Sequence, residues 1–275
     1  YLRSGDLEKA LAMNVALAQV DEAAAYREAW LRAEVLRRDA VDKRKAGLLV
    51  EAEALLDAAR ATDPTSRNVL LEQTYTWLDL GKLADARKAI SDLERITAPK
   101  DGDKGEPDRD VLIANAWVLA GEQRFEEGLT LLERMKDADL DPGTVKLKRR
   151  LRVQADIAQA LKLAGRGKLI SAQARLTELQ RNHRDDAELV GLMANAWADL
   201  GKYDQALAVM YDALAQVKTE SPTLKLQLAG ILHKADREAE LLGVLRELDA
   251  ESDLTPPERK GLADLKIAYS VKRAD

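Results

Sequence analysis

A short unit of the form Gly-x-apolar-x-x-Ala recurs along the chain, and its spacing constrains the fold more than any other feature. Copies begin at Gly5, Gly47, Gly81, Gly167 and Gly201, and degenerate copies begin at Gln123 and Ala235. The interval is 34 residues from Gly47 to Gly81, from Gly167 to Gly201 and from Gly201 to Ala235. A unit of this length cannot bury a hydrophobic face on its own, so neighbouring repeats must stack against one another.

The residues around each unit predict two helices joined by a tight turn. In the repeat at 187–220, the first helix carries an apolar stripe that includes Trp197, and Gly201 ends it because a residue without a Cβ atom adopts the left-handed conformation. Tyr203 is expected to fill the joint, and Ala206 is small enough to let the two backbones approach. A 34-residue period with two helices is that of the tetratricopeptide repeat (TPR), and the sequence resembles this family over essentially its whole length.

The expected fold class is therefore all-α, with TPR helix-turn-helix repeats stacked in a right-handed superhelical solenoid. Composition agrees, because 46% of the residues are hydrophobic and only 4% aromatic, so Ala and Leu must supply most of the core. The repeat-defining structural residues are Gly47, Ala52, Pro64, Trp77, Gly81, Ala86, Gly167, Ala172, Trp197, Gly201, Tyr203 and Ala206. Longer intervals of 42 and 44 residues predict lengthened first helices and an irregular solenoid, with a hinge near 98–108 in "APKDGDKGEPD".

The predicted organisation is one solenoid over residues 1–275. It begins with the second helix of a truncated repeat at 1–20 and ends with the first helix of a truncated repeat at 255–275. Complete repeats are expected at 22–65, 67–98, 109–138, 144–184, 187–220 and 221–250. Neither end has the polar face of a capping repeat, which predicts that the chain is a fragment of a longer array.

Several kinds of chemistry are disfavoured by the sequence. There is no Cys, and the two His residues lie about fifty positions apart. The acidic segment that starts at Asp101 places Gly105, Glu106 and Leu112 at the fifth, sixth and twelfth positions of a calcium loop, which does not fit. "NHRDD" around His183 is better explained as a solvated turn than as a metal site. We expect no enzyme, no metal and no cofactor, and the net charge of −5 argues against a nucleic-acid partner.

The TPR resemblance implies a ligand-binding concave side, lined by positions 2, 5, 9 and 12 of each first helix. The candidate concave-groove residues are Asn68, Leu71, Tyr75, Asp110, Ile113, Trp117 and Asn195. Taking Ala235 as the marker places Lys225 and Ala229 at positions 5 and 9 of the repeat at 221–250. Aromatic faces such as those of Tyr75 and Trp117 can anchor a peptide or stack on a sugar ring, and packing between adjacent repeats is the competing interpretation.

A cluster of basic residues lies in the segment "VKLKRRLR". Its members are Lys146, Lys148, Arg149, Arg150 and Arg152. The cluster is explained either as a solvated helix face balanced by neighbouring acids or as a docking patch for an anionic partner.

The order of segments carries a second, narrower resemblance. "AEALLDAARATDP", "LLEQTYTWLDLGKLADARKAISDL" and "LIANAWVLAGEQRFEEGLTLLERM" are followed by "LMANAWADLGKYDQALAVM" and "LTPPERKGLADLKIAYSVKRAD". This order resembles the periplasmic TPR region of the bacterial cellulose synthase C subunits, a family of cellulose exporters. The chain departs from that pattern where "DPTSRN" stands in place of "DPNNPW".

The narrower resemblance implies a non-catalytic periplasmic scaffold in a protein anchored in the bacterial outer membrane by a C-terminal β-barrel. Such a scaffold would bridge synthase components to the outer-membrane pore and guide the glucan chain. The implied partners are other cellulose or exopolysaccharide secretion proteins, with peptidoglycan or the glucan chain as further candidates. The fragment itself contains no run of eighteen apolar residues that could span a membrane. The alternative is a generic TPR adaptor that binds a peptide in its concave groove.

Overall fold

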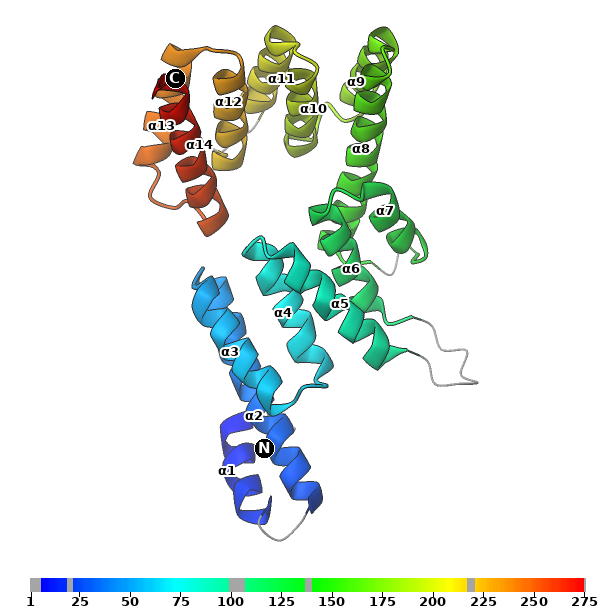
Figure 1. Ribbon diagram of the computed structural model, residues 1–275, viewed down its shortest axis with the longest axis vertical. Coiled ribbons are helices and arrows are strands. Elements are labelled where there is room, and N and C mark those ends of the chain that lie inside the picture. The colour runs from blue at the N-terminus through cyan, green and yellow to red at the C-terminus, as the bar shows by residue number, and fades with distance from the viewer. Residues whose placement is uncertain (1–5, 19–21, 99–106, 137–139, 217–220, 275) are drawn as a thin grey trace. The chain divides into compact units, whose positions relative to one another are not determined.

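The computed structural model describes residues 6–18, 22–98, 107–136, 140–216 and 221–274, and every regular element in these ranges is a helix (Figure 1). The helices are α1 (Leu7–Ala18), α2 (Glu22–Lys45), α3 (Leu49–Thr62), α4 (Arg67–Asp79), α5 (Leu83–Thr97), α6 (Arg109–Gly121), α7 (Phe125–Glu133), α8 (Pro142–Gly165), α9 (Leu169–Asn182), α10 (Ala187–Asp199), α11 (Tyr203–Gln216), α12 (Pro222–Lys234), α13 (Glu238–Ala250) and α14 (Pro256–Ala274). The predicted all-α fold of helix-turn-helix repeats is confirmed.

A left-handed residue joins the two helices of each repeat. Gly47, Gly81, Gly167 and Gly201 have φ between +70° and +77°. At Gly81 the turn is closed by two backbone hydrogen bonds: Gly81 N donates to Leu78 O at 3.0 Å, and Lys82 N donates to Trp77 O at 2.8 Å. These bonds satisfy carbonyls that would otherwise lack partners at the helix end.

Two turns use residues other than glycine. Gln123 has φ of 60° and Asp236 has φ of 56°, so both take the conformation that Gly takes elsewhere. The marker expected at Ala235 is therefore off by one residue, because the left-handed residue between α12 and α13 is Asp236. This shift moves every groove position of α12 by one.

The chain divides into two compact units, residues 1–145 and 146–275, with the boundary inside the first turn of α8. A single solenoid over 1–275, its handedness and its irregularity stay predictions. Most of the expected hinge at 98–108 lies outside the described residues.

The units share an order of elements that repeats after 120 residues. Helices α2 and α8 are 24 residues long, and they begin at 22 and 142. The following starts are also 120 residues apart: α3 and α9 at 49 and 169, α4 and α10 at 67 and 187, and α5 and α11 at 83 and 203. The lengthened first helices predicted from the long intervals are thus confirmed, because α4 and α10 contain only 13 residues each.

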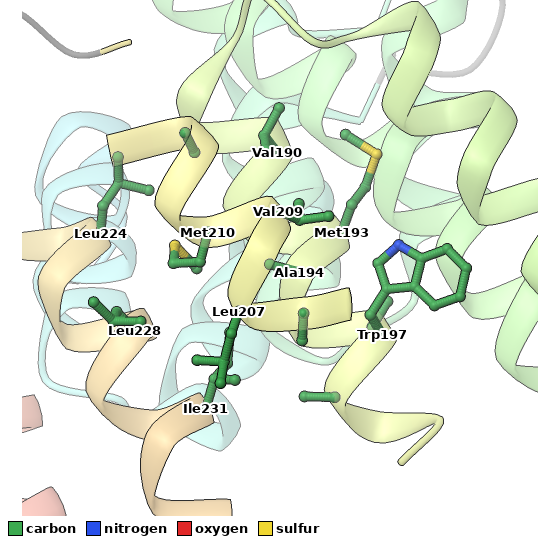
Figure 2. Packing of buried hydrophobic residues seen from close by; sticks show 14 of the residues in the cluster. Val190, Met193, Ala194, Trp197, Leu207, Val209, Met210, Leu224, Leu228 and Ile231 are labelled. Atoms are coloured by element: carbon green, nitrogen blue, oxygen red, sulfur yellow. The ribbon is translucent and has the colours of Figure 1, made fainter. Parts of the chain in front are cut away.

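The core of unit 2 forms where α10, α11 and α12 meet. Met193 and Met210 are fully buried, and Leu228 packs in the same cluster. Figure 2 shows these side chains converging from the three helices. The alanine of each repeat unit, at Ala52, Ala86, Ala172 and Ala206, is 0% exposed. Small side chains at these positions let the helix backbones approach closely.

One joint residue does not behave as expected. Trp197 is buried, with 5% of its surface exposed, but Tyr203 is 36% exposed. Tyr203 is the first residue of α11, so its side chain lies at the end of the helix pair rather than between the helices. Of these two aromatic residues, Trp197 is the one that is buried.

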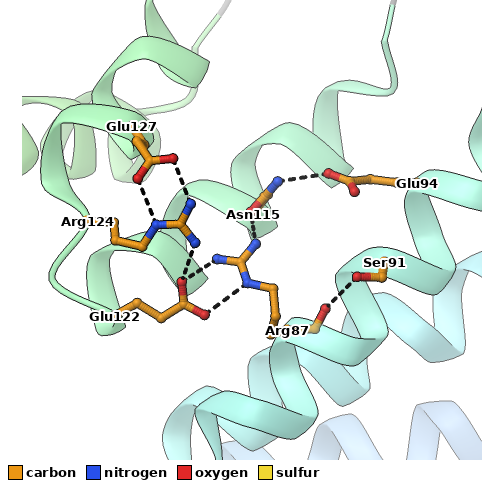
Figure 3. Close-up of polar contacts among 7 residues, drawn as sticks. All are labelled: Arg87, Ser91, Glu94, Asn115, Glu122, Arg124 and Glu127. Carbon is orange, nitrogen blue, oxygen red and sulfur yellow. Dashed lines mark hydrogen bonds and ion pairs between the residues drawn. The ribbon is translucent and has the colours of Figure 1, made fainter.

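In unit 1, a network of charge-assisted hydrogen bonds links α5, α6 and α7 (Figure 3). Arg87 donates to both carboxylate oxygens of Glu122, at 2.9 and 2.7 Å, and to Asn115 Oδ1 at 2.7 Å. Asn115 in turn donates to Glu94 at 2.9 Å, and Arg124 binds Glu122 at 3.0 Å. Bidentate arginine–carboxylate pairs of this kind fix orientation as well as contributing stability.

Candidate functional site

Two of the predicted groove residues in unit 1 are aromatic, one exposed and one half-buried. Trp117 on α6 is 37% exposed. Tyr75 on α4 is half-buried, and burial raises the pKa of its hydroxyl to about 12, with a contribution from the carboxylate of Asp110. The guanidinium carbon of Arg44 lies 5.7 Å from the centre of the Tyr75 ring, within the range of a cation–π interaction. One face of Tyr75 is therefore already in contact with the protein.

Arg44 belongs to a group of charges between α2 and α4. Its guanidinium lies 3.3 Å from Glu72 and 3.3 Å from Asp79. Arg37 lies 2.5 Å from Glu34 and 3.6 Å from Glu72. The sequence reasoning did not select either arginine as a candidate. Counting back from Gly47 would have found them, because they occupy positions 5 and 12 of the first helix of their repeat.

One further groove candidate in unit 1, Asp110, makes a structural contact. Arg67 binds Asp108 through two bonds of 2.6 Å and binds Asp110 at 2.7 Å, which connects α4 with the start of α6. The Arg67 guanidinium holds the pKa of Asp108 below its usual range. Asp108 also caps α6 by accepting from Asp110 N and Val111 N. Asp110 is thus partly used in holding adjacent repeats together.

The remaining candidates of unit 1 differ in accessibility. Asn68 is exposed and Ile113 is half-buried. Leu71 is only 8% exposed, because it packs into the hydrophobic cluster of α4, α5 and α6. Contrary to the sequence-based expectation, Leu71 is not available to a ligand.

Unit 2 contains an open groove of about 770 Å³ formed by first helices. Its lining comes from α10, the segment before α14, and helices α12 and α14: Asn195, Thr223, Leu226, Gln227, Gly230, Lys234, Thr255, Pro257, Glu258, Gly261, Asp264, Leu265 and Ala268. Of the predicted groove residues, only Asn195 belongs to it. Its amide nitrogen donates to Gly191 O at 3.2 Å.

The one-residue shift at Asp236 explains why sequence reasoning missed most of this groove. Counted from Asp236, positions 2, 5 and 9 of α12 are Thr223, Leu226 and Gly230, and all three line the groove. Counted from Ala235, position 9 would be Ala229, which is fully buried. The periodic positions of α12 identify the groove residues once the left-handed turn residue is placed at Asp236.

Helices α10 and α12 approach closely beside the groove. A Cβ atom added at Gly191 would lie 2.2 Å from Gln227 Oε1 and 3.0 Å from a methyl carbon of Leu224. A side chain at Gly191 would therefore require the Gln227 side chain to move. Gln227 Oε1 is buried and accepts no hydrogen bond within the described part of the chain.

The basic cluster on α8 is partly neutralised within unit 2. Lys146 binds Glu188 at 2.7 Å, and Arg149 lies 3.3 Å from Asp186. Lys148 and Arg152 also interact with other residues, whereas Arg150 is exposed. These contacts favour the interpretation of a helix face balanced by neighbouring acids over that of a docking patch.

The described ranges contain neither a metal-binding cluster nor a membrane-spanning helix. No group of three or more His, Cys, Asp or Glu side chains is placed there to hold a metal ion. No helix in those ranges combines the length and the hydrophobicity needed to cross a bilayer.

Comparison with known proteins places this geometry in context. No known family profile matches the chain. A protein named cellulose synthase operon protein C from Xanthomonas axonopodis pv. citri is 29% identical over 280 residues, which cover 100% of this chain and 18% of that protein. A protein of the same name from Pseudomonas fluorescens is 26% identical, covering 83% of this chain and 17% of its own length. The chain thus spans about a fifth of the length of these relatives.

A solved structure supports the fold assignment. The crystal structure of a tetratricopeptide repeat protein from Parabacteroides merdae superposes with a TM-score of 0.56 and 15% sequence identity. The superposition covers 97% of this chain and 94% of that one. The chain therefore has the tetratricopeptide-repeat fold, and its sequence resembles that of cellulose synthase operon protein C.

Proposed function

We propose that this chain is a non-catalytic, protein-binding scaffold of a cellulose or related exopolysaccharide exporter. In this proposal it works in the periplasm as part of a protein anchored in the outer membrane. It connects synthase components with the outer-membrane pore and helps to guide the glucan. The observation that carries the proposal is the similarity to cellulose synthase operon protein C along the whole chain.

The geometry supports protein binding rather than chemistry. First helices line an open groove in unit 2, and its walls contain apolar, amide and carboxylate groups. Concave sites with a mostly apolar lining and a few polar groups suit recognition of a partner. The charged groups of unit 1 that could attract a ligand largely bind one another across adjacent helices.

Direct stacking of a sugar chain on unit 1 has weaker support. A stacking platform needs open aromatic faces. Trp117 offers one, but Arg44 lies over the ring of Tyr75. Titration of the full chain with cellohexaose tests this role. Binding that is lost in Trp117→Ala would support glucan contact as a function of unit 1.

The scaffold proposal is tested by removing residues 22–275 in frame from the parent protein. We expect cellulose to disappear from the cell surface while glucan synthesis in isolated membranes is unchanged. In a matched control, the segment is replaced by the TPR protein of Parabacteroides merdae, which has the same fold. A specific scaffold leaves export blocked in that replacement.

Two outcomes would contradict the proposal. Restored export in the replacement would show that the segment serves only as a spacer. Normal export after the deletion would favour the alternative, a generic adaptor that binds peptides in its concave groove. The partner of that adaptor would then be identified by affinity capture with the intact chain.

A further inference from the structure

Three of the residues that line the unit 2 groove have little or no side chain. Gly230 lies in the middle of α12 and Gly261 in the first half of α14, with Ala268 further along the same helix. A Cβ atom at Gly230 would meet nothing within 4 Å, and one at Gly261 would meet only a methyl carbon of Leu226 at 3.7 Å. The space above both glycines is open.

These glycines are not explained by packing within unit 2. Glycine inside a helix destabilises it relative to alanine, because glycine loses more conformational freedom on folding. Gly191 on α10 differs, since a side chain there would collide with Gln227. Neither Gly230 nor Gly261 has such a collision or a positive φ. The room that they leave is available to a molecule that enters the groove.

The groove walls suit a polypeptide better than a sugar chain. Leu226, Leu265 and Pro257 supply apolar contacts for side chains. Asn195 uses its amide nitrogen on Gly191 O, so its carbonyl oxygen remains as an acceptor for a backbone N–H. No aromatic side chain occurs among the described residues that line the groove, so there is no face on which a pyranose ring could stack.

The charged side chains of the groove indicate which charge a ligand should carry. Lys234, the one lysine among the described residues of the lining, binds Asp199 at 2.7 Å, which neutralises it. Glu258 accepts hydrogen bonds from Thr223 and Thr255, neither of which carries charge. Asp264 is exposed and forms no ion pair with any described residue. Two carboxylates therefore remain uncompensated, which favours a positively charged ligand.

We propose that the unit 2 groove binds an extended polypeptide segment that carries a basic side chain. Its backbone lies over Gly230 and Gly261, its apolar residues contact Leu226 and Leu265, and its lysine or arginine reaches Asp264. This proposal rests on the proposed scaffold function, because it names the chemistry of a protein partner.

The test is selection of a phage-displayed random peptide library on the full chain. Enriched peptides should carry at least one Lys or Arg flanked by apolar residues. A synthetic copy of the most enriched peptide is then titrated against the chain, together with a version in which Glu replaces the basic residue. We expect the Glu version to bind about tenfold more weakly.

Matched variants locate the binding site. Gly230→Leu fills the groove and should abolish binding, whereas Gly243→Leu on α13 also adds a side chain where nothing lies within 4 Å but does not line the groove. Binding by Gly243→Leu should equal that of the unchanged protein. Asp264→Lys should reverse the preference, so that the Glu peptide binds better. Circular dichroism of each variant checks that the helices are retained.

Several results would overturn the inference. Enrichment of acidic peptides, binding that survives in Gly230→Leu, or no enrichment at all would each do so, as would cellohexaose binding that Gly230→Leu removes. These results leave the scaffold proposal intact if deletion of residues 22–275 still blocks export. Conversely, normal export after that deletion with basic-peptide binding retained would reject only the exporter role.

Discussion

Trp77 in unit 1 and Trp197 in unit 2 lie at equivalent positions 120 residues apart, each at the joint between the two helices of its repeat. Different interactions stabilise these two joints. Trp77 Nε1 donates to Glu53 Oε1 at 2.8 Å, and Lys82 Nζ binds the same carboxylate at 2.6 Å. The position equivalent to Glu53 is Gln173. Trp197 Nε1 is buried and finds no acceptor among the described residues. One backbone arrangement therefore accommodates either a polar or an apolar joint.

The same contrast extends to neighbouring positions. Gln73 is 2% exposed and donates to Asp57 at 2.9 Å, whereas its equivalent, Met193, is fully buried in a hydrophobic cluster. Arg87, which organises the network of Figure 3, corresponds to buried Leu207. The repeat fold requires the turn residue and the small alanine, while the chemistry between the helices can vary.

The largest expected effect comes from the apolar joint. Met210→Ala should lower the free energy of unfolding of unit 2 by about 2–5 kcal/mol, because a fully buried side chain is replaced by a cavity. Native-state hydrogen exchange, read on peptides from each unit, measures the loss separately. Val50→Ala is the control, since Val50 is 73% exposed and its truncation should change little. A loss below about 1 kcal/mol for Met210→Ala would mean that this cluster is not a close-packed core.

The second prediction is that lowering the pH should destabilise unit 1, which contains the polar joint, before it destabilises unit 2. Basic partners lower the pKa of Glu53, Asp92 and Glu122, chiefly Lys82, Arg95 and Arg87 respectively. A carboxyl whose pKa is lower in the folded state adds stability above its unfolded pKa and loses it as pH falls through the folded pKa. The usual values are 4.5 for Glu and 3.8 for Asp, so the loss begins below about pH 4.5.

Hydrogen exchange corrected for intrinsic rates, followed from neutral pH to pH 3 (about the lower end of this titration), checks the order of loss. Peptides from unit 1 should lose protection at higher pH than peptides from unit 2. Simultaneous loss in both units would show that these carboxylates do not set the acid stability of unit 1.

The third prediction concerns the replacement of Arg87 in unit 1 by leucine, the residue at the equivalent position of unit 2. Arg87→Leu should lower the stability of unit 1 by about 1–3 kcal/mol, because Glu122 and buried Asn115 lose a hydrogen-bond donor. Denaturant unfolding with the same exchange readout measures it. Arg95→Leu is the matched control, since the Arg95 side chain is 76% exposed in its pair with Asp92. Equal effects of the two substitutions would argue against a special role for the network.

The smallest effect is expected when a carboxylate is introduced beside Trp197, as is present beside Trp77. Gln173→Glu offers Trp197 Nε1 an acceptor and gives Lys202 a partner, as Glu53 does for Trp77 and Lys82. Unit 2 should gain about 0.5–1.5 kcal/mol. Thermal unfolding of Gln173→Glu with and without Lys202→Met separates the two contributions. A loss of stability would mean that the carboxylate is desolvated without reaching Trp197.

The sequence predicted the backbone of the repeats well because each repeat depends on local features. Glycine at a positive φ and alanine at the closest approach can be read directly, as at Gly81 and Ala86. The groove was predicted poorly because Asp236 takes a conformation that usually signals glycine. A count based on the 34-residue interval therefore slipped by one in α12. Partners such as Arg44 and Tyr75 depend on side-chain conformations across two helices, which periodicity alone does not determine.

The difference between Arg87 and Leu207 has a consequence for assembly of the chain during synthesis. Repeats with nearly identical backbones can dock onto the wrong neighbour, which is a common misfolding route in repeat proteins. Docking α5 in the place of α11 would bury the Arg87 guanidinium away from Glu122, and the reverse exchange would leave Glu122 without its bidentate partner. The different contacts of Arg87 and Leu207 therefore disfavour an exchange of α5 and α11.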